Sequence, residues 1–553
     1  MSIGIGTTSA LAGTLLVSDS LVKVPQLITE YFAFQPDVEC KAQQVSFGTS
    51  GHRGSSLEQS FNEWHVLAIC QAICHYRAKQ AWSGPLFLGA DTHALSSAAF
   101  ASAMEVLAAN GVDVMVSPKH EPTPTPAVSL AILTFNQGRN HGLADGIVIT
   151  SSHNPPDSGG IKYNPPHGGA ANCEVTTWIQ DHANELMLRA LQGVKRVSYQ
   201  TALNAATTHA YNYLEKYVRA LPHVIDLKLI SEAGVRLAID PLGGAGVHYW
   251  SRIANEFDLD LSVLNTDLDP TFRFVLADWD GAIRMDPSSS FVMQNALSKK
   301  NQYDILGACD TDHDRHGVVT PLGGLLPSNH FLLVAINYLF QHRPAWKPTL
   351  GIGKTMVTSQ SIDRLAAHVN RPIFETPAGF KWFAEGLQKS SLGFCGEESA
   401  GATFLRKDGG VWTSDKDGLI PILLAAEIKA KTGDDPAHIY QLLCTSLGTS
   451  FYQREEMPAS VAQKTKVKEI TPQSVAACDL AGEKIIEIAT RAKGNGQCLG
   501  GVKVSTKNAW FAIRPSGTEA LVKIYAESFI GEQHLQTVLA EAKIMLNDAV
   551  SAK

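Results

Sequence analysis

The sequence GIVITSSHNP, residues 146–155, places a hydroxyl and an imidazole directly after a short apolar run. An apolar run of this length is typical of a buried strand, and the Asn-Pro step favours a turn. The pattern therefore predicts a strand that delivers Ser152 to an exposed bend, where a nucleophile is accessible. A serine-histidine pair in a loop is more often a local hydrogen-bonding device, so its interpretation depends on the rest of the chain.

A second polar segment, DTDHDRHG, lies at residues 310–317 between two apolar runs. In an extended segment the carboxylates of Asp310, Asp312 and Asp314 point to the same side. Like charges this close raise one another's pKa values unless a cation neutralises them, and hard oxygen ligands select Mg²⁺, Mn²⁺ or Ca²⁺. The segment predicts a metal site, with a solvated acidic turn as the alternative. It lacks the glycine and the distal acid of an EF-hand, which excludes a calcium sensor of that type.

Two further loops combine glycine with polar side chains. RPSGTE at residues 514–519 offers a guanidinium, hydroxyls and backbone N–H groups, a donor set that suits a phosphate dianion. An ordinary hairpin is the alternative. GEESAG at residues 396–401 offers acceptors and a hydroxyl that suit the neighbouring hydroxyls of a sugar, with a capped turn as the alternative.

Taken together, in their order along the chain, the four loops resemble those of the α-D-phosphohexomutase superfamily. The family's phosphoserine loop, T-x-S-H-N-P, matches residues 150–155, and its metal loop, D-x-D-x-D-R, matches residues 310–315. The sugar loop of its glucose-specific branch, G-E-E-S-A-G, matches residues 396–401, and its phosphate loop matches residues 514–519. An early S-G-x-R-G element matches residues 50–54, so the motifs span nearly the whole chain.

The resemblance implies an intramolecular phosphotransferase of the isomerase class that interconverts α-D-glucose 1-phosphate and glucose 6-phosphate. The implied route passes through a phosphoserine enzyme and a glucose 1,6-bisphosphate intermediate, with Mg²⁺ as the metal. Relatives that act on mannose or glucosamine phosphates typically carry a histidine where this chain has Gly401, which points to the glucose-specific bacterial type.

The resemblance also carries residue roles over to matching positions. The implied catalytic residues are Ser152, His153, Lys162 and Arg53. His153 and Lys162 are the candidates for the general acid/base, and the sequence leaves this choice open. The alternatives are a structural ion pair for Lys162 and a scaffold hydrogen-bond donor for His153. The implied metal ligands are Ser152, Asp310, Asp312 and Asp314. The implied substrate-binding residues are Arg315, Lys381, Glu397, Ser399, Arg514, Ser516, Gly517 and Thr518. A solvated lysine beside an aromatic pair remains the alternative for Lys381.

Two other function classes stay open at this stage. A metal-dependent phosphatase with a serine nucleophile would need a water-activating site, which the sequence does not locate. A non-catalytic relative is expected to have lost Ser152 or one of the aspartates, and all of these residues are present.

The resemblance implies small hexose phosphates as the partners, and the composition agrees with a large cytosolic enzyme. With 553 residues and 44% apolar content the chain can bury several cores. The formal charge of −7 and the absence of basic blocks do not indicate binding to nucleic acid or to a membrane surface. Nine cysteines without C-x-x-C spacing predict reduced thiols rather than disulfides or a zinc site. We expect a cytoplasmic monomer or dimer.

The expected fold is α/β. The resemblance implies four domains around a central active-site cleft, three of related mixed-sheet α/β topology and a smaller α+β C-terminal domain. The expected boundaries are 1–40 (N-terminal extension), 41–210 (phosphoserine domain), 211–322 (metal-binding domain), 323–435 (sugar-binding domain) and 436–553 (phosphate-binding domain). Local patterns predict a capping box at residues 60–63, a linker-like stretch at residues 457–483 and an amphipathic helix at residues 532–550.

Overall fold

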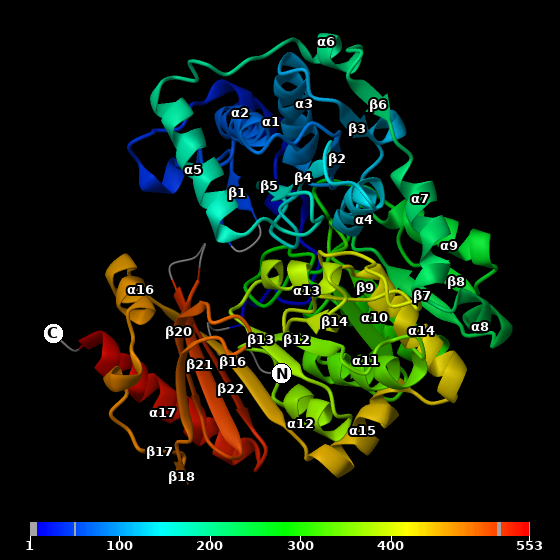
Figure 1. Cartoon of the computed structure of the whole chain (residues 1–553), viewed down its shortest axis with the longest axis vertical. Helices are drawn as coiled ribbons and strands as arrows, with labels where there is room; N and C mark the ends of the chain where they lie inside the picture. Colours follow the sequence, from blue (N-terminus) through cyan, green and yellow to red (C-terminus); the bar gives the residue numbers. More distant parts are fainter. Residues whose placement is uncertain (1–7, 49–50, 517–520, 552–553) are drawn as a thin grey trace.

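Four large sheets follow one another along the chain in the computed structural model (Figure 1). The structure describes residues 8–48, 51–516 and 521–551. The first three sheets combine parallel strands with antiparallel strands at one edge, whereas the fourth is antiparallel throughout. This confirms the predicted class of three related α/β domains followed by a smaller C-terminal domain, which is mostly built of strands.

The first sheet has the strand order β1-β5-β4-β2-β3-β6 and is covered on both faces. Alternate residues of a strand point to opposite faces. Leu86 and Leu88 therefore pack with α2, α3 and α5, whereas Phe87 packs with α4 on the other side. The strands are β1 (His52–Ser55), β2 (Leu86–Ala90), β3 (Val114–Val116), β4 (Asp145–Ile149), β5 (Ser158–Asn164) and β6 (Thr208–Ala210). The helices are α1 (Val24–Ala33), α2 (Glu63–Lys79), α3 (Ala94–Ala109), α4 (Thr125–Asn136), α5 (Cys173–Leu188) and α6 (Tyr199–Leu203).

The second sheet, ordered β11-β10-β9-β7-β8, carries the three aspartates in the loop between β9 and β10. At one edge of this sheet β10 runs antiparallel to β9, and β11 runs antiparallel to β10. The loop between β9 and β10 is therefore a tight connection rather than a helical crossover. The strands are β7 (Leu237–Asp240), β8 (Leu261–Val263), β9 (Ile305–Cys309), β10 (His316–Thr320) and β11 (Gly324–Leu325). The helices are α7 (Tyr213–Ala220), α8 (Leu227–Glu232), α9 (Val247–Phe257) and α10 (Gln294–Ser298).

The third sheet, ordered β13-β12-β14-β15, shares its packing with the second. Helix α14 contacts β9 and β10 of the second sheet, and one apolar cluster runs through the first three domains. The strands are β12 (Gly351–Thr355), β13 (Ile373–Thr376), β14 (Leu392–Gly396) and β15 (Ala402–Phe404). The helices are α11 (Ser328–His342), α12 (Ser361–His368), α13 (Ala384–Gln388), α14 (Leu419–Thr432) and α15 (Pro436–Leu447). Because α15 packs on α11 and α12, we propose that the third domain extends through α15.

The fourth sheet, ordered β16-β22-β21-β20-β19, packs helices on one face and the third domain on the other. Helix α17 covers β21 and β22, while Trp510 and Tyr525 pack against Met356 and Val357. The strands are β16 (Phe451–Pro458), β19 (Glu487–Arg491), β20 (Cys498–Ser505), β21 (Ala509–Pro515) and β22 (Leu521–Ser528), with a small pair β17 (Asp479–Leu480) and β18 (Glu483–Lys484) beside them. The helices are α16 (Val461–Lys468) and α17 (Glu532–Ser551).

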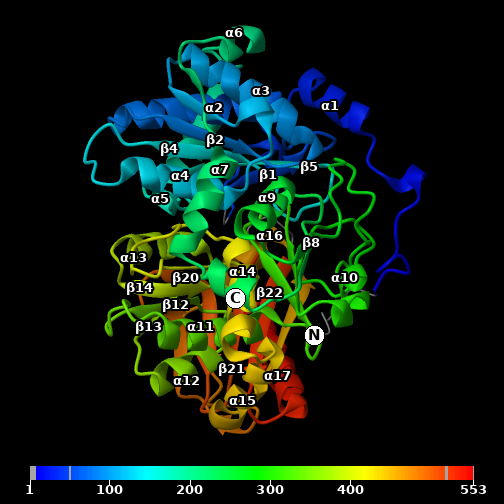
Figure 2. The ribbon, with the colours of Figure 1, turned by 90° about the vertical axis from the view of Figure 1, so that its right-hand side faces the viewer.

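The N-terminal segment crosses from the second domain to the first (Figure 2). Backbone N–H groups of Ser9 and Gly13 donate to the carbonyls of Trp279 and Ala277, each at 2.8 Å. Further along, Tyr31 of α1 is buried and donates its hydroxyl to Ser102 of α3 at 3.1 Å. The segment is therefore packed against both domains. No helix in the part of the chain that the structure describes is long and apolar enough to span a membrane.

Two local predictions need correction. Asn62, not Ser60, caps α2, and its reciprocal partner is His65. The stretch at residues 457–483 is not a linker, since it holds α16 and β17 and buries Val467 and Leu480. Isolated apolar residues among many polar ones do not produce a periodic signal, which is why composition alone indicated a linker.

Glu427 of α14 provides a test of how the second and third domains are held together. Arg343, 6% exposed, donates to both carboxylate oxygens of Glu427 at 2.7 and 3.1 Å. The backbone N–H of Asp226 donates to the same carboxylate at 2.9 Å. Glu427→Gln leaves the guanidinium buried without its counter-charge, so we expect the free energy of unfolding to fall by roughly 3–5 kcal/mol.

The measurement is the urea midpoint followed by circular dichroism. Glu232→Gln is the matched control, because Glu232 is exposed and 3.6 Å from exposed Lys228, a pair worth at most about 1 kcal/mol. Equal midpoints for the two variants would contradict the role given to the buried pair.

Candidate active site

The loop between β4 and β5 presents Ser152 in a left-handed conformation, with φ at 58°. Its hydroxyl donates to Asp310 Oδ2 at 2.6 Å, and Thr311 donates its hydroxyl to the Ser152 carbonyl. Ser152 is 0% exposed, so the predicted exposed bend is wrong. The sequence places the serine at the end of a strand, but it does not reveal that the second domain covers the bend.

The three aspartates between β9 and β10 converge on one point. One carboxylate oxygen from each of Asp310, Asp312 and Asp314 lies within 4.8 Å of the other two, and all three residues are buried. The segment is a turn rather than the extended strand that was predicted, since His313 has φ at 55°. The backbone N–H groups of Asp314 and Arg315 donate to Asp310 Oδ1, each at 3.0 Å, and hold the turn closed.

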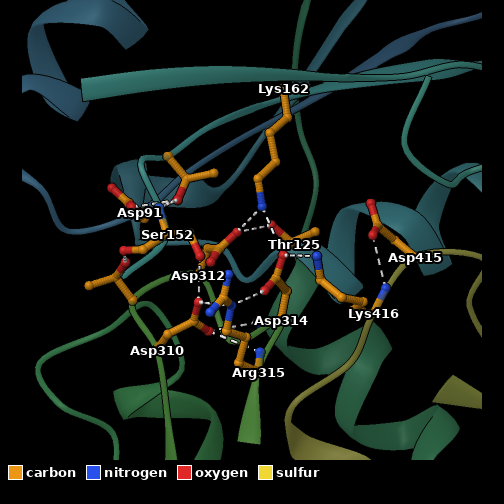
Figure 3. Close-up of polar contacts among 12 residues, drawn as sticks. Asp91, Thr125, Ser152, Lys162, Asp310, Asp312, Asp314, Arg315, Asp415 and Lys416 are labelled. Carbon is orange, nitrogen blue, oxygen red and sulfur yellow. Dashed lines mark hydrogen bonds and ion pairs between the residues drawn. The ribbon is translucent and has the colours of Figure 1, made fainter. Parts of the chain in front are cut away.

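Two lysines from other domains contact this triad (Figure 3). Lys162 of β5 lies 2.6 Å from Asp312 and 2.9 Å from Asp314, and Lys416, between β15 and α14, lies 3.1 Å from Asp314. Burial alone would lower the pKa of Lys162, but the two carboxylates raise it above the ordinary lysine value. Burial would likewise raise the pKa of Asp314, but Lys162 and Lys416 hold it below its usual range.

Asp310 differs from its neighbours because it has no lysine partner in the described part of the chain. Burial first, and then the charges of Asp312 and Asp314, raise its pKa well above the ordinary value. Arg315 is its nearest cation, with Nε at 3.9 Å from Asp310 Oδ2. Beside Ser152, the negative charge of the aspartates is therefore not fully balanced by cations of the described residues.

The triad fits a divalent cation. Asp312 Oδ1 is buried and has no hydrogen-bond partner among the residues described. A buried oxygen of this kind is costly unless it has a partner, and hard carboxylate ligands select divalent cations such as Mg²⁺ or Ca²⁺. Asp310, Asp312 and Asp314 are therefore capable of holding a metal, with the Ser152 hydroxyl beside them.

Three arginines lie near His153, the residue after Ser152. Arg53 donates to the Asn154 side chain at 3.1 Å, which brings β1 to the serine loop. Burial, and then Arg315, Arg53 and Arg284, lower the pKa of His153 well below its ordinary value. His153 is therefore a neutral imidazole inside a positively charged region, which suits an anionic ligand.

The predicted sugar loop lies directly against the metal loop. The Ala400 carbonyl accepts the backbone N–H of His316 at 3.0 Å, so β10 and the loop after β14 are joined. Glu397 accepts the Gly379 N–H at 3.0 Å, and burial raises the pKa of its carboxyl. Ser399 is partly buried in the same loop. Lys381 lies 3.2 Å from Cys173 Sγ, a contact between the third and first domains.

The phosphate-loop prediction is only partly described by the structure. Arg514 is at the end of β21 and donates to the Tyr525 hydroxyl at 3.3 Å, and the Ser516 N–H donates to Leu521 at 2.9 Å. Gly517 and Thr518 lie outside the described residues. Among the described residues, no contact joins Arg514 to the aspartate triad.

Sequence reasoning missed three residues that shape this site. Thr125 donates its hydroxyl to Asp312 Oδ2 at 2.6 Å, and Asp91 accepts the hydroxyl of Thr150, two residues before Ser152, at 2.6 Å. Lys416 passes across Gly401, where a Cβ would come within 2.1 Å of the lysine side chain. Charged residues between apolar runs at residues 413–418 were the available signal for Lys416, but nothing in the sequence links Thr125 or Asp91 to the triad.

Comparisons with known proteins agree with this arrangement. Four models of the phosphoglucomutase/phosphomannomutase family match in order: α/β/α domain I at residues 44–190, domain II at 215–323, domain III at 327–446 and the C-terminal domain at 463–543. A phosphoglucomutase from Komagataeibacter xylinus is 50% identical over 544 residues, covering 98% of this chain and 97% of its own. Phosphoglucomutase 1 from Drosophila melanogaster is 26% identical and covers 91% of this chain and 93% of its own.

The fold has solved counterparts as well. The phosphoprotein pp63/parafusin from Paramecium, in its open form, aligns with a TM-score of 0.71 at 21% identity, covering 93% of this chain and 95% of its own. At that level of identity the likeness concerns the fold.

Replacement of one aspartate tests the metal site. Asp312→Asn removes one negative charge and the unpartnered oxygen, so we expect affinity for Mn²⁺, used as a probe, to fall by more than roughly 10-fold. The measurement is free Mn²⁺ by electron paramagnetic resonance during titration. Asp286→Asn is the control, since Asp286 is 4.0 Å from Arg315 but outside the triad. Unchanged Mn²⁺ affinity in Asp312→Asn would rule out the site.

Proposed function

This chain belongs to the phosphoglucomutase/phosphomannomutase family, and on that premise we propose that it interconverts α-D-glucose 1-phosphate and glucose 6-phosphate. The observation that carries the proposal is the buried Ser152 hydroxyl, which donates to Asp310 at 2.6 Å inside a cluster of charges from three domains. The 50% identity to a phosphoglucomutase over 98% of the chain supports the same activity.

The proposed chemistry is a phosphoryl relay through Ser152. The phosphoserine O–P bond breaks, a bond forms between phosphorus and O6 of glucose 1-phosphate, and the O6 proton passes to a protein base. The resulting glucose 1,6-bisphosphate turns end over end, and its C1 phosphate returns a phosphoryl group to Ser152. Glucose 6-phosphate leaves, and the phosphoserine is restored.

Charge neutralisation and alignment dominate phosphoryl transfer. Mg²⁺ held by Ser152, Asp310, Asp312 and Asp314 would supply positive charge at the transferring group. The protein adds fixed charge of its own, since Lys162 contacts two of the aspartates and Arg315 lies 3.9 Å from Asp310 and from Asp314. Arg53, tied to the serine loop through Asn154, would add a further guanidinium near the phosphate.

His153 and Lys162 remain the two candidates for proton transfer. The depressed pKa of His153 keeps its imidazole neutral, so it is able to accept a proton from the sugar hydroxyl. The raised pKa of Lys162 keeps its ammonium protonated, so it is able to donate to the departing serine oxygen. We propose that His153 accepts the proton of the sugar hydroxyl and that Lys162 donates a proton to the departing serine oxygen.

The substrate would be held at both ends. We assign the sugar hydroxyls to Glu397, Ser399 and Lys381 of the third domain. Glu397 lies near enough to Lys416 and Arg315 for their charges to act on its carboxyl. We assign the phosphate that is not reacting to the loop of Arg514, Ser516, Gly517 and Thr518. Arg454 lies 4.0 Å from Glu398, so a charged contact links the sugar loop to the fourth domain that carries this phosphate loop.

The glucose preference is proposed from Gly401. Any side chain at this position would collide with Lys416, so the histidine expected in mannose-specific or glucosamine-specific relatives does not fit here without moving that lysine. All nine cysteines are unpaired, which supports a reducing compartment and hence the cytoplasm. We further propose that the enzyme acts as a monomer or dimer.

Removal of the nucleophile tests the relay. Ser152→Ala should abolish conversion of glucose 1-phosphate to glucose 6-phosphate, because no hydroxyl remains to carry the phosphoryl group. Ser151→Ala is the matched control, since Ser151 is the buried neighbour whose hydroxyl donates only to the Ser158 carbonyl at 3.3 Å. A coupled assay measures turnover, and intact mass measures phosphorylation. Turnover in Ser152→Ala, or release of inorganic phosphate as the main product of the wild type, would overturn the proposal.

Arg514 tests the phosphate anchor. Arg514→Lys keeps the charge but loses the planar fork that matches phosphate oxygens, so binding should weaken by roughly 1–3 kcal/mol for charge-assisted bonds. KM should rise for both glucose 1-phosphate and glucose 1,6-bisphosphate, while phosphorylation of Ser152 at saturating bisphosphate persists. Arg491→Lys, at an exposed position in the same sheet, is the control. Unchanged KM for both ligands would show that the loop is an ordinary hairpin.

A further inference from the structure

Asp91 and His93 lie just after β2, beside the serine loop but outside the residues assigned above. Asp91 Oδ2 accepts the Thr150 hydroxyl at 2.6 Å and His93 Nδ1 at 2.8 Å. Asp91 Oδ1 accepts the Ser96 hydroxyl at 2.5 Å. Asp91 is 6% exposed and His93 2% exposed, so these bonds lie in the protein interior.

The second ring nitrogen of His93 reaches the serine loop directly. His93 Nε2 lies 3.0 Å from the backbone carbonyl of Asn154. A carbonyl oxygen and a carboxylate oxygen are both acceptors, so each ring nitrogen must carry a proton to make its bond. A neutral imidazole would leave one nitrogen lone pair facing a buried oxygen lone pair, which costs free energy on both sides. The geometry therefore requires a buried imidazolium.

The pair holds the serine loop on both sides of the nucleophile. Because the Thr150 hydroxyl donates to Asp91, its lone pair is available to accept the Ser152 N–H, at 2.8 Å. The Asn154 carbonyl is held by His93 on the other side. Ser152 has φ at 58°, a conformation that L-residues rarely adopt and that persists only where the surroundings enforce it.

We propose that Asp91 and His93 are positioning residues for Ser152, with His93 present as an imidazolium that fixes the loop in its left-handed conformation. The kinetic part of this inference rests on the proposed function, whereas the protonation state does not. The charged groups that act on His93 are Asp91 and, at longer range, Asp312, and the Phe272 ring packs 5.3 Å away. Burial works against the charged ring, but Asp91 and the bond to Asn154 raise its pKa above the ordinary histidine value.

Nitrogen NMR of protein labelled in its histidine rings tests the protonation state. At a pH just above the ordinary histidine pKa, both ring nitrogens of His93 should still be protonated, and His93→Gln assigns the signals by deleting them. His65 is the matched internal control, because it is buried in the same domain and its Nε2 lies 2.8 Å from the Gln43 carbonyl. Its Nδ1 lies 2.9 Å from Asn62 Oδ1 but also accepts the Asn62 N–H at 3.1 Å, so a neutral ring satisfies both nitrogens, and burial lowers its pKa to about 3. His65 should therefore show one bare nitrogen. One bare nitrogen on His93 under the same conditions would overturn the inference.

The positioning role is tested by kinetics of the same variants. His93→Gln should lower kcat by roughly 100-fold, the scale of loss expected when a reacting group is misplaced, with KM for glucose 1-phosphate little changed. Thr150→Val should act in the same direction, because it removes the link from Asp91 to the Ser152 N–H. His65→Gln should leave kcat unchanged even if it lowers the melting temperature.

The outcomes separate the two levels of inference. Equal losses of kcat in His93→Gln and His65→Gln, or a loss confined to KM, would show that His93 has only a structural role. Absence of mutase turnover in the wild type would instead defeat the proposed function, and the nitrogen signals would still decide the protonation state of His93.

Discussion

The site depends on the cost of burying three carboxylates together. One carboxylate oxygen from each of Asp310, Asp312 and Asp314 lies within 4.8 Å of the other two, and all three residues are buried. Repulsion at this distance in the protein interior is tolerated only where cations compensate for it. Lys162 comes from the first domain and Lys416 from the third, whereas the aspartates belong to the second. Ion pairs at the triad therefore join three domains. Asp310 remains the least compensated of the three and is the one that the Ser152 hydroxyl contacts.

This arrangement explains why Ser152 is buried although its loop is polar. The second domain supplies both the Asp310 oxygen that accepts the Ser152 hydroxyl and the Thr311 hydroxyl that donates to its carbonyl. The first domain enforces the strained backbone through Thr150 and Asn154. The surroundings of Ser152 therefore depend on how the first two domains pack together. The N-terminal segment contacts both domains, since it bonds to Ala277 and packs α1 on α3.

The sequence predicts the parts of this molecule that local patterns encode. Strand ends, the alternating α/β order and the aspartate spacing were readable because apolar periodicity and like-charge clustering appear within a few residues. The burial of Ser152 was not readable, since it depends on Thr311, which lies 159 residues further along the chain. Asp91, Thr125 and Lys416 were missed for the same reason: each acts through a contact between segments far apart in sequence. The spacing of Asp310, Asp312 and Asp314 correctly predicted that their carboxylates cluster. The backbone conformation was predicted wrongly, because the segment is a turn and not extended.

The central claim is that Ser152 carries a phosphoryl group which passes to the sugar. The most direct measurement is a single-turnover chase, in which enzyme carrying radiolabelled phosphate on Ser152 is mixed with unlabelled glucose 1-phosphate and quenched over time. The account predicts that label leaves the protein as glucose 1,6-bisphosphate and then appears in glucose 6-phosphate, at a rate no slower than steady-state turnover. Label that stays on the protein during turnover, or that leaves only as inorganic phosphate, would contradict it.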